Sequence, residues 1–510
     1  MTHDDDKNND DKDADIEADN LTLDKDDETD NIPNTNHNNA QKRHLYTHSQ
    51  HVKQIASLTG PIIISEVFQN ALPLVDIAFV GQLTSKEDLA AAALATVWFN
   101  LWNSTMLGFC TAIDTLLSQS FGARQFDTFA MWSGNSIFIV SLVSIIIGAL
   151  IATCHPMMVI FGQDPTIAAA AGQFSYRLLP GLLPYYIFKV LIKHLQAQNI
   201  LLPGALIGIF ANIFNIFANW FCISYLDMGL NGAPIATTLT RVLELLFIIV
   251  YFYWKKSTLL SKTFPVFSIR NLNREAISTF LKIAINSALS LSAEAWSFEI
   301  TTILAGLLGT VAVDAHIITM SIVGFLYFSF PFAVGIATSI RIGQLIGEGS
   351  AADAKRSSTV SFVLTIALQG ALIAIVMPIS DQLGKLFSND EDVSRLVTQL
   401  IPLSCIFMLG DAIQSNAGGV LRGLGQQKLL LLLNIIGFWL LAIPAGALLT
   451  FVADIGVNGL WWGMTIGIYS SSLIGLALLK FYINWDKEAE DAKYRISAAH
   501  KMDYSSVERK

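Results

Sequence analysis

The sequence predicts an all-α integral membrane protein in which twelve transmembrane helices form two pseudo-symmetric six-helix lobes. Three observations lead to this fold class: a composition typical of membrane proteins, about twelve long apolar segments, and short motifs that occur in both halves of the chain. Of the 510 residues, 53% are hydrophobic and 14% are charged. Soluble proteins have about 25% charged residues, so this deficit predicts that most of the chain lies in lipid.

The negative charge of the chain is concentrated near its start. Residues 1–30 contain fourteen Asp or Glu and three Lys, a net charge of −11, whereas the whole chain has −9. The rest of the chain therefore carries −9 + 11 = +2. A segment this polar cannot bury enough apolar surface to fold, so residues 1–54 are predicted to be a disordered tail. No cleavable signal peptide is expected, and the first apolar segment should stay in the membrane.

About twelve apolar segments are long enough to cross a bilayer, which takes ~20 helical residues. They lie at residues 57–80, 89–117, 130–155, 165–192, 200–225, 230–254, 278–308, 312–338, 357–380, 394–421, 429–452 and 457–482. The second, eighth and tenth contain enough polar residues to make hydropathy alone ambiguous. We expect these boundaries to hold to within a few residues.

Two motifs occur once in each half of the chain. The sequence DMGLNG at residues 227–232 returns as DIGVNG at residues 454–459, an offset of 227. The Gln119–Gly122 pair returns as Gln344–Gly347, at nearly the same offset. Duplicated halves are typical of transporters, because two similar bundles can rock about a site held between them.

The charges of the connecting segments predict the orientation in the membrane. Alternate loops are basic, with Arg124, Lys193, Lys255, Lys355, Arg356, Arg422 and Lys428, and the others are mainly acidic. Loops rich in Lys and Arg stay in the cytoplasm, so both termini are predicted to be cytoplasmic. On this basis residues 55–254 and 278–482 form the two lobes. A basic linker at 255–277 joins them, and residues 483–510 form a solvated cytoplasmic tail.

Polar side chains form stripes along several predicted helices. Charged groups in a membrane helix are costly and usually face the interior of the bundle. In the first helix Gln69 and Asp76 fall on one face, and Pro73 between them predicts a kink. We expect the following polar and aromatic residues to line a substrate cavity: Gln69, Asn100, Asp114, Trp296, Tyr327 and Gln414. Flat aromatic rings bind organic cations by cation–π attraction, although a structural role for Tyr327 is an equal alternative.

Three carboxylates stand in the middle of predicted helices of the second half. Glu294 and Asp411 have no basic neighbour close by in their own helices, and we expect them to bind a proton or a cation rather than to serve structure alone. An acid in a medium of low dielectric constant binds a proton readily. For Glu299 the functional and structural interpretations are evenly balanced, since five residues place it about 140° around the helix from Glu294.

Other polar groups are better explained by packing. The asparagines of the fifth helix, Asn212, Asn215 and Asn219, are expected to form hydrogen bonds between helices. Arg241 and Glu244 of the sixth helix are spaced i, i+3 and are expected to pair locally. The four cysteines lack the spacing of a metal site or a disulfide pair and are expected to be buried as free side chains.

The order of several motifs resembles the multidrug and toxic compound extrusion (MATE) family, its eukaryotic branch in particular. The resemblance covers residues 55–482. It rests on AIDTLLSQSFGA at 112–123, LPGL at 179–182, GAPIA at 232–236, GGVLRG at 418–423 and GQQK at 425–428. It implies two six-helix lobes around a central cavity, alternating access, and export of organic, often cationic compounds driven by inward H⁺ or, in some members, Na⁺.

The resemblance also implies roles for individual residues. Glu294 and Glu299 match an acidic pair on the seventh helix of eukaryotic members, and Asp411 stands where such members usually have Glu. Asp76 matches an acid on the first helix that is typical of prokaryotic members. Ser321 replaces a further glutamate of some animal members, so their substrate range is not carried over.

The predicted function is therefore that of a proton-coupled antiporter that exports organic, mostly cationic xenobiotics. The alternatives are a Na⁺-coupled exporter, a flippase of the same superfamily for a lipid-linked substrate, and a membrane-embedded enzyme or receptor. No nucleotide loop, nucleophile motif or metal-spaced cluster supports an enzyme. We expect no cofactor beyond an H⁺ or Na⁺ gradient. The expected partners are small organic cations and the plasma, vacuolar or vesicular membrane, with no nucleic acid, and the expected state is a monomer.

Overall fold

A computed structural model describes residues 45–255, 258–267, 274–388 and 390–507, which are helical apart from short connections. The helices of the first half are α2 (His48–Leu83), α3 (Lys86–Gly122), α4 (Phe126–Ala152), α5 (Cys154–Ile160), α6 (Pro165–Leu178), α7 (Leu182–Gln196), α8 (Leu202–Asn219) and α9 (Gly232–Trp254). Those that follow are α10 (Thr258–Thr263), α11 (Arg274–Gly306), α12 (Thr310–Ser329), α13 (Pro331–Gly347), α14 (Ala351–Val376), α15 (Ser380–Phe387), α16 (Glu391–Leu424), α17 (Gln427–Asn434), α18 (Ile443–Ala447), α19 (Val457–Ala477) and α20 (Trp485–Val507).

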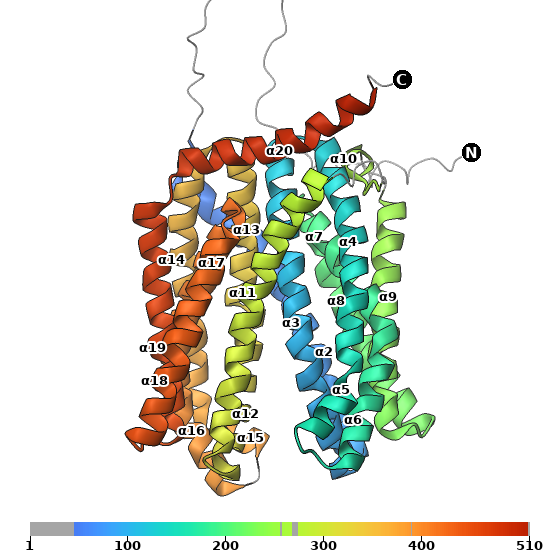
Figure 1. The fold of residues 1–510 in the computed structure, drawn as a ribbon, viewed down its shortest axis with the longest axis vertical. Helices are drawn as coiled ribbons and strands as arrows, with labels where there is room; N and C mark the ends of the chain where they lie inside the picture. Colours follow the sequence, from blue (N-terminus) through green and yellow to red (C-terminus); the bar gives the residue numbers. More distant parts are fainter. Residues whose placement is uncertain (1–44, 256–257, 268–273, 389, 508–510) are drawn as a thin grey trace, which may run out of the picture. The chain divides into compact units, whose positions relative to one another are not determined.

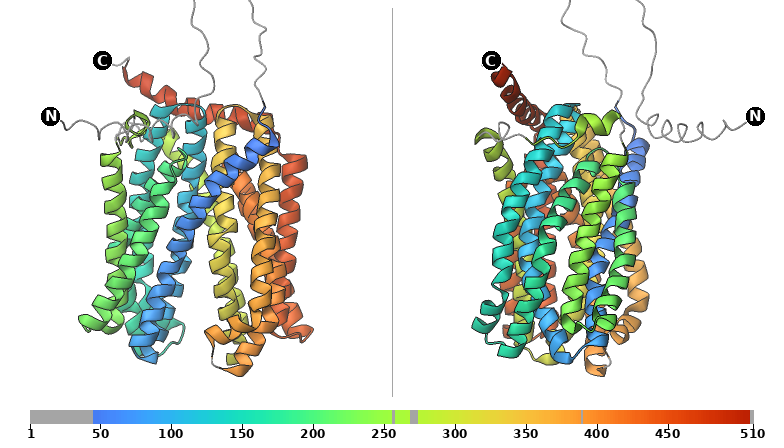
Figure 2. Two further views of the ribbon diagram at one scale, coloured as in Figure 1. Left: turned by 180° about the vertical axis from the view of Figure 1, so that it is seen from behind. Right: turned by 90° about the vertical axis from the view of Figure 1, so that its right-hand side faces the viewer.

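The long helices run side by side, and α20 lies across their ends (Figures 1 and 2). We call this the α20 end and the other the opposite end. Within the described residues, eleven helical segments are long and apolar enough to cross a membrane. The predicted second span, α3, is not among them, because its asparagines, serines, threonines and tryptophans lower its mean hydropathy, as the sequence indicated. Large apolar side chains such as Ile145 and Leu473 are 64–68% exposed on the outside of the bundle, as a lipid-facing surface requires.

The repeated DxGxNG motifs share positive φ angles at their Asp and first Gly residues. Asp227 and Gly229 have φ angles of 52° and 54°, and Asp454 and Gly456 have 55° and 66°. A left-handed backbone is readily adopted only by Gly and, less often, by Asp or Asn. Each motif also follows a π-helical turn and precedes a long helix. The internal repeat of the sequence is therefore also a repeat of structure.

The second repeated pair joins the two halves of the chain. Gly122 ends α3 and packs against the backbone of Gln344, while Gly347 ends α13 and packs against the backbone of Gln119. A side chain at either glycine would overlap the partner's carbonyl group, so glycine is needed for this close approach. The two equivalent segments thus meet each other near the α20 end.

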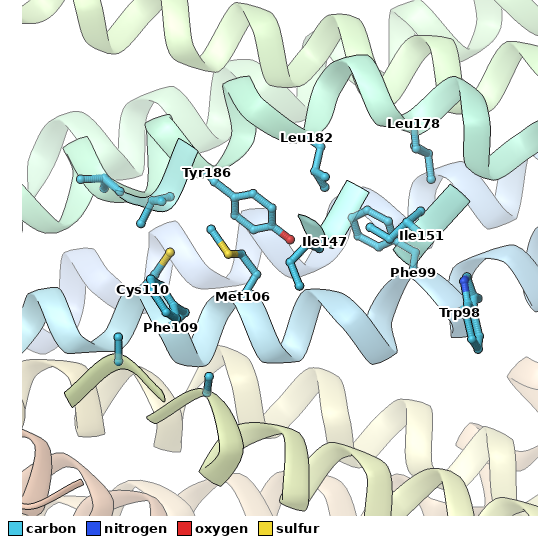
Figure 3. Packing of buried hydrophobic residues seen from close by; sticks show 14 of the residues in the cluster. Trp98, Phe99, Met106, Phe109, Cys110, Ile147, Ile151, Leu178, Leu182 and Tyr186 are labelled. Carbon is cyan, nitrogen blue, oxygen red and sulfur yellow. The ribbon is translucent and has the colours of Figure 1, made fainter. Parts of the chain in front are cut away.

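Each half has its own apolar core. In the first half, α3 contributes Trp98, Phe99, Met106 and Phe109, which pack with side chains of α4, α6 and α7 such as Tyr186 (Figure 3). In the second half, Phe407, Phe438 and Trp461 are fully buried together. Since these cores are formed mainly within a half, polar contacts can gather where the halves meet.

The prediction of a disordered tail at residues 1–54 is wrong for the last part of that range. Residues 1–44 lie outside the described residues, but α2 begins at His48, inside the range predicted to be disordered. Thr47 explains this start, because its hydroxyl accepts a hydrogen bond from the Gln50 amide and the Gln50 side chain accepts one from the Thr47 amide. The backbone of Tyr46 also donates to Asp353 of α14 at 3.1 Å.

The expected C-terminal tail is also corrected. Residues 483–510 were predicted to be solvated, but α20 has a buried face formed by Trp485, Ala489, Ala492 and Ile496. Of the predicted linker 255–277, residues 256–257 and 268–273 lie outside the described residues. The short helix α10 forms within it, and α11 already begins at Arg274.

Candidate functional site

A polar cavity lies within the second half of the chain. Four helices of that half, together with α3, supply its lining: Thr111, Ser287, Ser290, Leu291, Glu294, Tyr327, Gln414, Ser415, Gly418, Arg422, Leu430 and Asn434. Three of the residues predicted from the sequence, Glu294, Tyr327 and Gln414, are therefore brought together. The free volume of the cavity is about 20 Å³, which is the space of about one water molecule. Small-molecule sites usually measure ~300 Å³ or more, so an organic ligand would have to widen this cavity.

Asn434 of α17 organises the polar groups of this cavity. Its Nδ2 amide donates to the Oε2 atom of Glu294 at 3.2 Å and to the Ser290 carbonyl and hydroxyl oxygens at 3.0 and 3.1 Å. Its Oδ1 atom accepts a hydrogen bond from Nε2 of Gln414 at 2.6 Å. One asparagine thus holds the Glu294 carboxylate and the Gln414 amide in fixed relative positions.

Asp411 is the second acid of this region. It lies on α16, is 4% exposed, and interacts electrostatically with Glu294. Neither acid is in an ion pair within 4.0 Å, since the two such pairs among the described residues lie elsewhere. Both carboxylates are therefore buried without a fixed positive partner in contact.

Arg422 adds a positive charge to the same lining. Its guanidinium is 5.7 Å from the centre of the Phe332 ring, and its Nε and Nη2 atoms are buried without a hydrogen-bond partner. Gly335 and Gly418 leave the room it occupies, with ideal Cβ positions 3.3 and 3.4 Å from its nitrogens. Arg422 therefore lies in the wall of the cavity, and its positive charge acts on Glu294 without a direct ion pair.

Seven of the predicted residues lie outside the lining of this cavity: Gln69, Asp76, Asn100, Asp114, Trp296, Glu299 and Asp411. Glu299 is half-buried, in keeping with its position around the helix from Glu294, and Asn100 is exposed. Trp296 is half-buried, donates from Nε1 to the Leu101 carbonyl oxygen at 3.3 Å, and packs edge-on against Trp102. Trp296 thus joins the two halves at mid-bundle instead of facing the cavity.

Asp114 was expected in the cavity but forms a buried ion pair. Both of its carboxylate oxygens accept hydrogen bonds from Nζ of Lys193, at 2.7 and 2.8 Å. The Asp114 side chain is 2% exposed and that of Lys193 is 11% exposed. The sequence prediction missed this pair because Lys193 was placed in a loop, whereas it lies on the last turn of α7.

Asp76 lies in a separate network in the first half. Asn219 and Asn215 of α8 donate to one of its oxygens at 2.8 and 3.3 Å, and the hydroxyl of Thr237 in α9 donates to the other. The asparagines of α8 therefore form bonds between helices, as predicted. Gln69 lies two turns before Asp76 on α2 and is not part of this network. Its side chain donates a hydrogen bond to Glu244 at 2.6 Å.

Residues that the sequence analysis did not assign to a site complete the polar contacts. Asn434 stands alone in an apolar stretch, and only its contact with α11 reveals its role. The backbone of Arg422 accepts a bond from Thr115, and Nε2 of Gln119 donates to the Gly423 carbonyl oxygen at 2.9 Å. These bonds join the halves between the cavity and the α20 end.

Comparison with known proteins gives consistent matches. The family model MatE matches residues 61–221 and 287–448. The chain is 30% identical over 446 residues to "Multidrug and toxin extrusion protein 2" of Mus musculus, covering 86% of this chain and 76% of that protein. It is 29% identical over 445 residues to "Multidrug and toxin extrusion protein 1" of Homo sapiens, covering 87% and 77%.

Solved structures match over most of their length. The eukaryotic MATE transporter AtDTX14 superposes with a TM-score of 0.83 at 27% identity, covering 88% of this chain and 99% of that chain. The Vibrio cholerae MATE transporter VcmN in its bent form gives a TM-score of 0.76 at 18% identity, over 88% and 99%, which shows the fold alone.

Proposed function

The chain belongs to the multidrug and toxin extrusion (MATE) family of membrane transporters, and from this premise we propose that it exports organic cations in exchange for protons. The observation that carries the proposal is the pair of buried acids, Glu294 and Asp411, which have no contacting positive partner. A buried carboxylate without such a partner is expensive unless it takes up a proton or a cation. The cavity can therefore hold either a proton or a cation, as exchange requires.

The proximity of the two acids favours binding of a proton and a cation in turn, rather than at the same time. Because Glu294 and Asp411 interact electrostatically, each opposes the ionisation of the other. Arg422 supplies one fixed positive charge to the lining. An organic cation must first widen this space, whose free volume is about 20 Å³. Once it is close to the acids, it favours their ionised form and displaces a proton. A returning proton neutralises an acid and weakens the binding of the cation. The Tyr327 ring in the lining suits an organic cation.

We place the chain in the membrane as twelve helices in two six-helix lobes, with α3 as the twelfth span. Matches of the family model in both halves and the repeated DxGxNG turns support two equivalent lobes. The basic α20 end is assigned to the cytoplasm by the distribution of Lys and Arg. The bonds of Thr115 and Gln119 to the second half would then close the cytoplasmic side in this conformation.

Transport by purified protein in liposomes tests the proposal. The assay measures uptake of radiolabelled tetraethylammonium under imposed pH or Na⁺ gradients. We expect uptake to follow the pH gradient and to be lost in Glu294→Gln, while Glu275→Gln, at the exposed start of the same helix, transports normally. Undiminished transport by folded Glu294→Gln protein would remove Glu294 from the coupling site, and uptake that follows only the Na⁺ gradient would assign the coupling to Na⁺.

A further inference from the structure

A third buried carboxylate lies in the first half of the chain, away from the cavity. Glu244 of α9 is fully buried, its Oε1 atom accepts a hydrogen bond from Nε2 of Gln69 at 2.6 Å, and its Oε2 atom has no hydrogen-bond partner. An ionised carboxylate without contact to a positive group is costly in such surroundings. The charge of an ionised Glu244 must therefore be neutralised by another group or by a bound proton.

The expected local pair with Arg241 is not formed. Arg241 points its guanidinium at two aromatic rings, with Cζ 4.9 Å from the centre of the Phe99 ring and 4.7 Å from that of Tyr185. Its Nη1 atom is buried without a partner, and the ion pairs found among the described residues do not include Glu244. The aromatic contacts compete successfully with the i, i+3 pair, so the sequence prediction was wrong here.

The charged groups that face Glu244 act on it without contact. Lys189 of α7 lies with its Nζ 5.5 Å from the Tyr185 ring, and both Lys189 and Arg241 attract Glu244 electrostatically. On α2, Glu66 interacts with Lys189. These cations make the ionised form of Glu244 attainable, but they do not hold it in a permanent ion pair.

A row of polar side chains runs from the Asp76 network toward Glu244. Thr237, Thr240 and Glu244 lie on one side of α9, because their spacing of three and four residues returns to the same face. Nδ2 of Asn215 faces both Asp76 and the Thr240 hydroxyl, at 3.3 and 3.4 Å. Gln69 and Asp76 stand two turns apart on α2, with Pro73 between them. We call Gln69, Asp76, Asn215, Thr237, Thr240 and Glu244 the polar seam.

We infer that Glu244 is a second proton-binding site of the transporter, separate from Glu294 and Asp411 and placed on the same polar seam as Asp76. The inference rests on proton coupling as proposed above, but not on Glu294 as its site. We assign a proton as the ligand, rather than a divalent or transition-metal ion. Among the described residues no cluster of three or more His, Cys, Asp or Glu could hold a metal, and the contacting group of Gln69 is its amide nitrogen, a donor.

The step that the site performs is a simple protonation. One oxygen of Glu244 binds H⁺ and becomes a neutral acid, while Lys189 and Arg241 keep their charge. On release, the ionised carboxylate keeps the Gln69 hydrogen bond and the field of the two cations. No other group is consumed or oxidised in this exchange.

Infrared spectroscopy of the purified protein tests the inference directly. The carbonyl stretch of a protonated carboxylic acid is followed while the pH is varied. We expect wild-type protein to show a band that is lost in Glu244→Gln and kept in the control Glu275→Gln, which is exposed at the start of α11. Proton uptake per molecule, measured with a dye in weak buffer over the same pH range, should fall by one in Glu244→Gln. An unchanged spectrum together with unchanged proton uptake would overturn the inference.

A second variant guards against misfolding of Glu244→Gln. In Gln69→Met the carboxylate loses its amide donor, so the band should persist to a higher pH than in wild type. A band in Gln69→Met that titrates as in wild type would also contradict the assignment. The Glu294→Gln variant separates the two proposals: if it transports normally while Glu244→Gln loses its band, the coupling site fails but the second proton site stands.

Discussion

Gly122 of the first half lies so close to the carbonyl group of Gln344 in the second half that a Cβ atom at residue 122 would overlap it. The pseudo-equivalent glycine, Gly347, stands in the same relation to the backbone of Gln119. The repeat found in the sequence is therefore the contact at which the halves close near the α20 end. If this contact opens and closes during transport, its tightness sets the balance between the two conformations.

Gly122→Ala should weaken this closure. Overpacking of a tight contact costs about 1–3 kcal/mol, and here the cost falls only on the state in which the halves touch. We expect a cysteine introduced in the closed contact to become more accessible to a water-soluble maleimide. Gly370→Ala is the matched control, since nothing lies within 4 Å of its Cβ position. Equal labelling of the two variants would show that the contact does not limit opening.

Asn434→Ala should weaken the binding of tetraethylammonium more than the small volume removed by the substitution would suggest. The substitution leaves the Gln414 amide without its acceptor and removes a donor from Glu294. A buried polar group that loses its partner costs about 1–3 kcal/mol, so affinity for tetraethylammonium should fall roughly tenfold or more. Binding is measured by scintillation proximity. Asn100→Ala, at an exposed position, should bind like wild type, and a loss there would restore Asn100 to the cavity.

Asp114→Asn should destabilise the protein through Lys193. With its partner neutral, the Lys193 ammonium is left buried, and breaking a buried pair costs about 3 kcal/mol or more. Thermal unfolding in detergent should shift clearly downward. The double variant Asp114→Asn with Lys193→Gln should recover part of this loss, because no unpaired charge remains. A double variant that is as unstable as the single one would mean that the pair contributes through packing alone.

Several features of the fold could be predicted from the sequence because they depend on local chemistry. Apolar segments of sufficient length mark the spans, and the DxGxNG turns need residues that tolerate positive φ. The same reasoning led us to expect a functional role for Glu294 and Asp411, since mid-span acids are rare. Both are buried, and their role in coupling stays a prediction. The reasoning failed for Arg241, which was expected to pair with Glu244 on the same helix. Arg241 instead contacts the aromatic rings of Phe99 in α3 and Tyr185 in α7.

The features that were not predicted depend on contacts between distant segments. Asn434 has no distinctive neighbours in the sequence, and its role comes from Glu294, 140 residues away. The apolar side of α20 is diluted by charged residues, so its sequence resembles a solvated tail. This side of α20 is buried because it packs against α13, α14 and α16.

Arg495 should stabilise the closed arrangement at the α20 end. Its Nε donates to Oε1 of Gln119 at 3.2 Å, and its Nη2 donates to the Leu424 carbonyl oxygen at 3.0 Å. It thereby contacts both halves, and hydrogen bonds from a charged group contribute about 1.5 kcal/mol or more. Arg495→Ala should increase hydrogen exchange at the ends of α3 and α16, whereas Lys493→Ala, at an exposed position, should not. Unchanged exchange in Arg495→Ala would leave α20 without influence on closure.

The docking of α20 should depend on pH through Glu488. Glu488 is buried against the bundle and accepts a hydrogen bond from Nε2 of Gln426 at 2.7 Å. Burial raises the pKa of Glu488, and the bond from Gln426 and the charge of Arg495 oppose this only in part. The docked helix therefore binds a proton more tightly than the undocked helix. Docking is then most favourable below the ordinary pKa of glutamate and weakens as the pH rises through the raised pKa.

Electron paramagnetic resonance between spin labels on α20 and on the end of α14 measures this effect. The docked fraction should fall as the pH is raised in wild type and in Glu490→Gln, whose side chain is exposed on the same helix. In Glu488→Gln the docked fraction should be high and independent of pH, because the amide is neutral throughout. A docked fraction that keeps its pH dependence in Glu488→Gln would assign the titration to another group, and one that rises with pH in wild type would contradict the sign derived from burial.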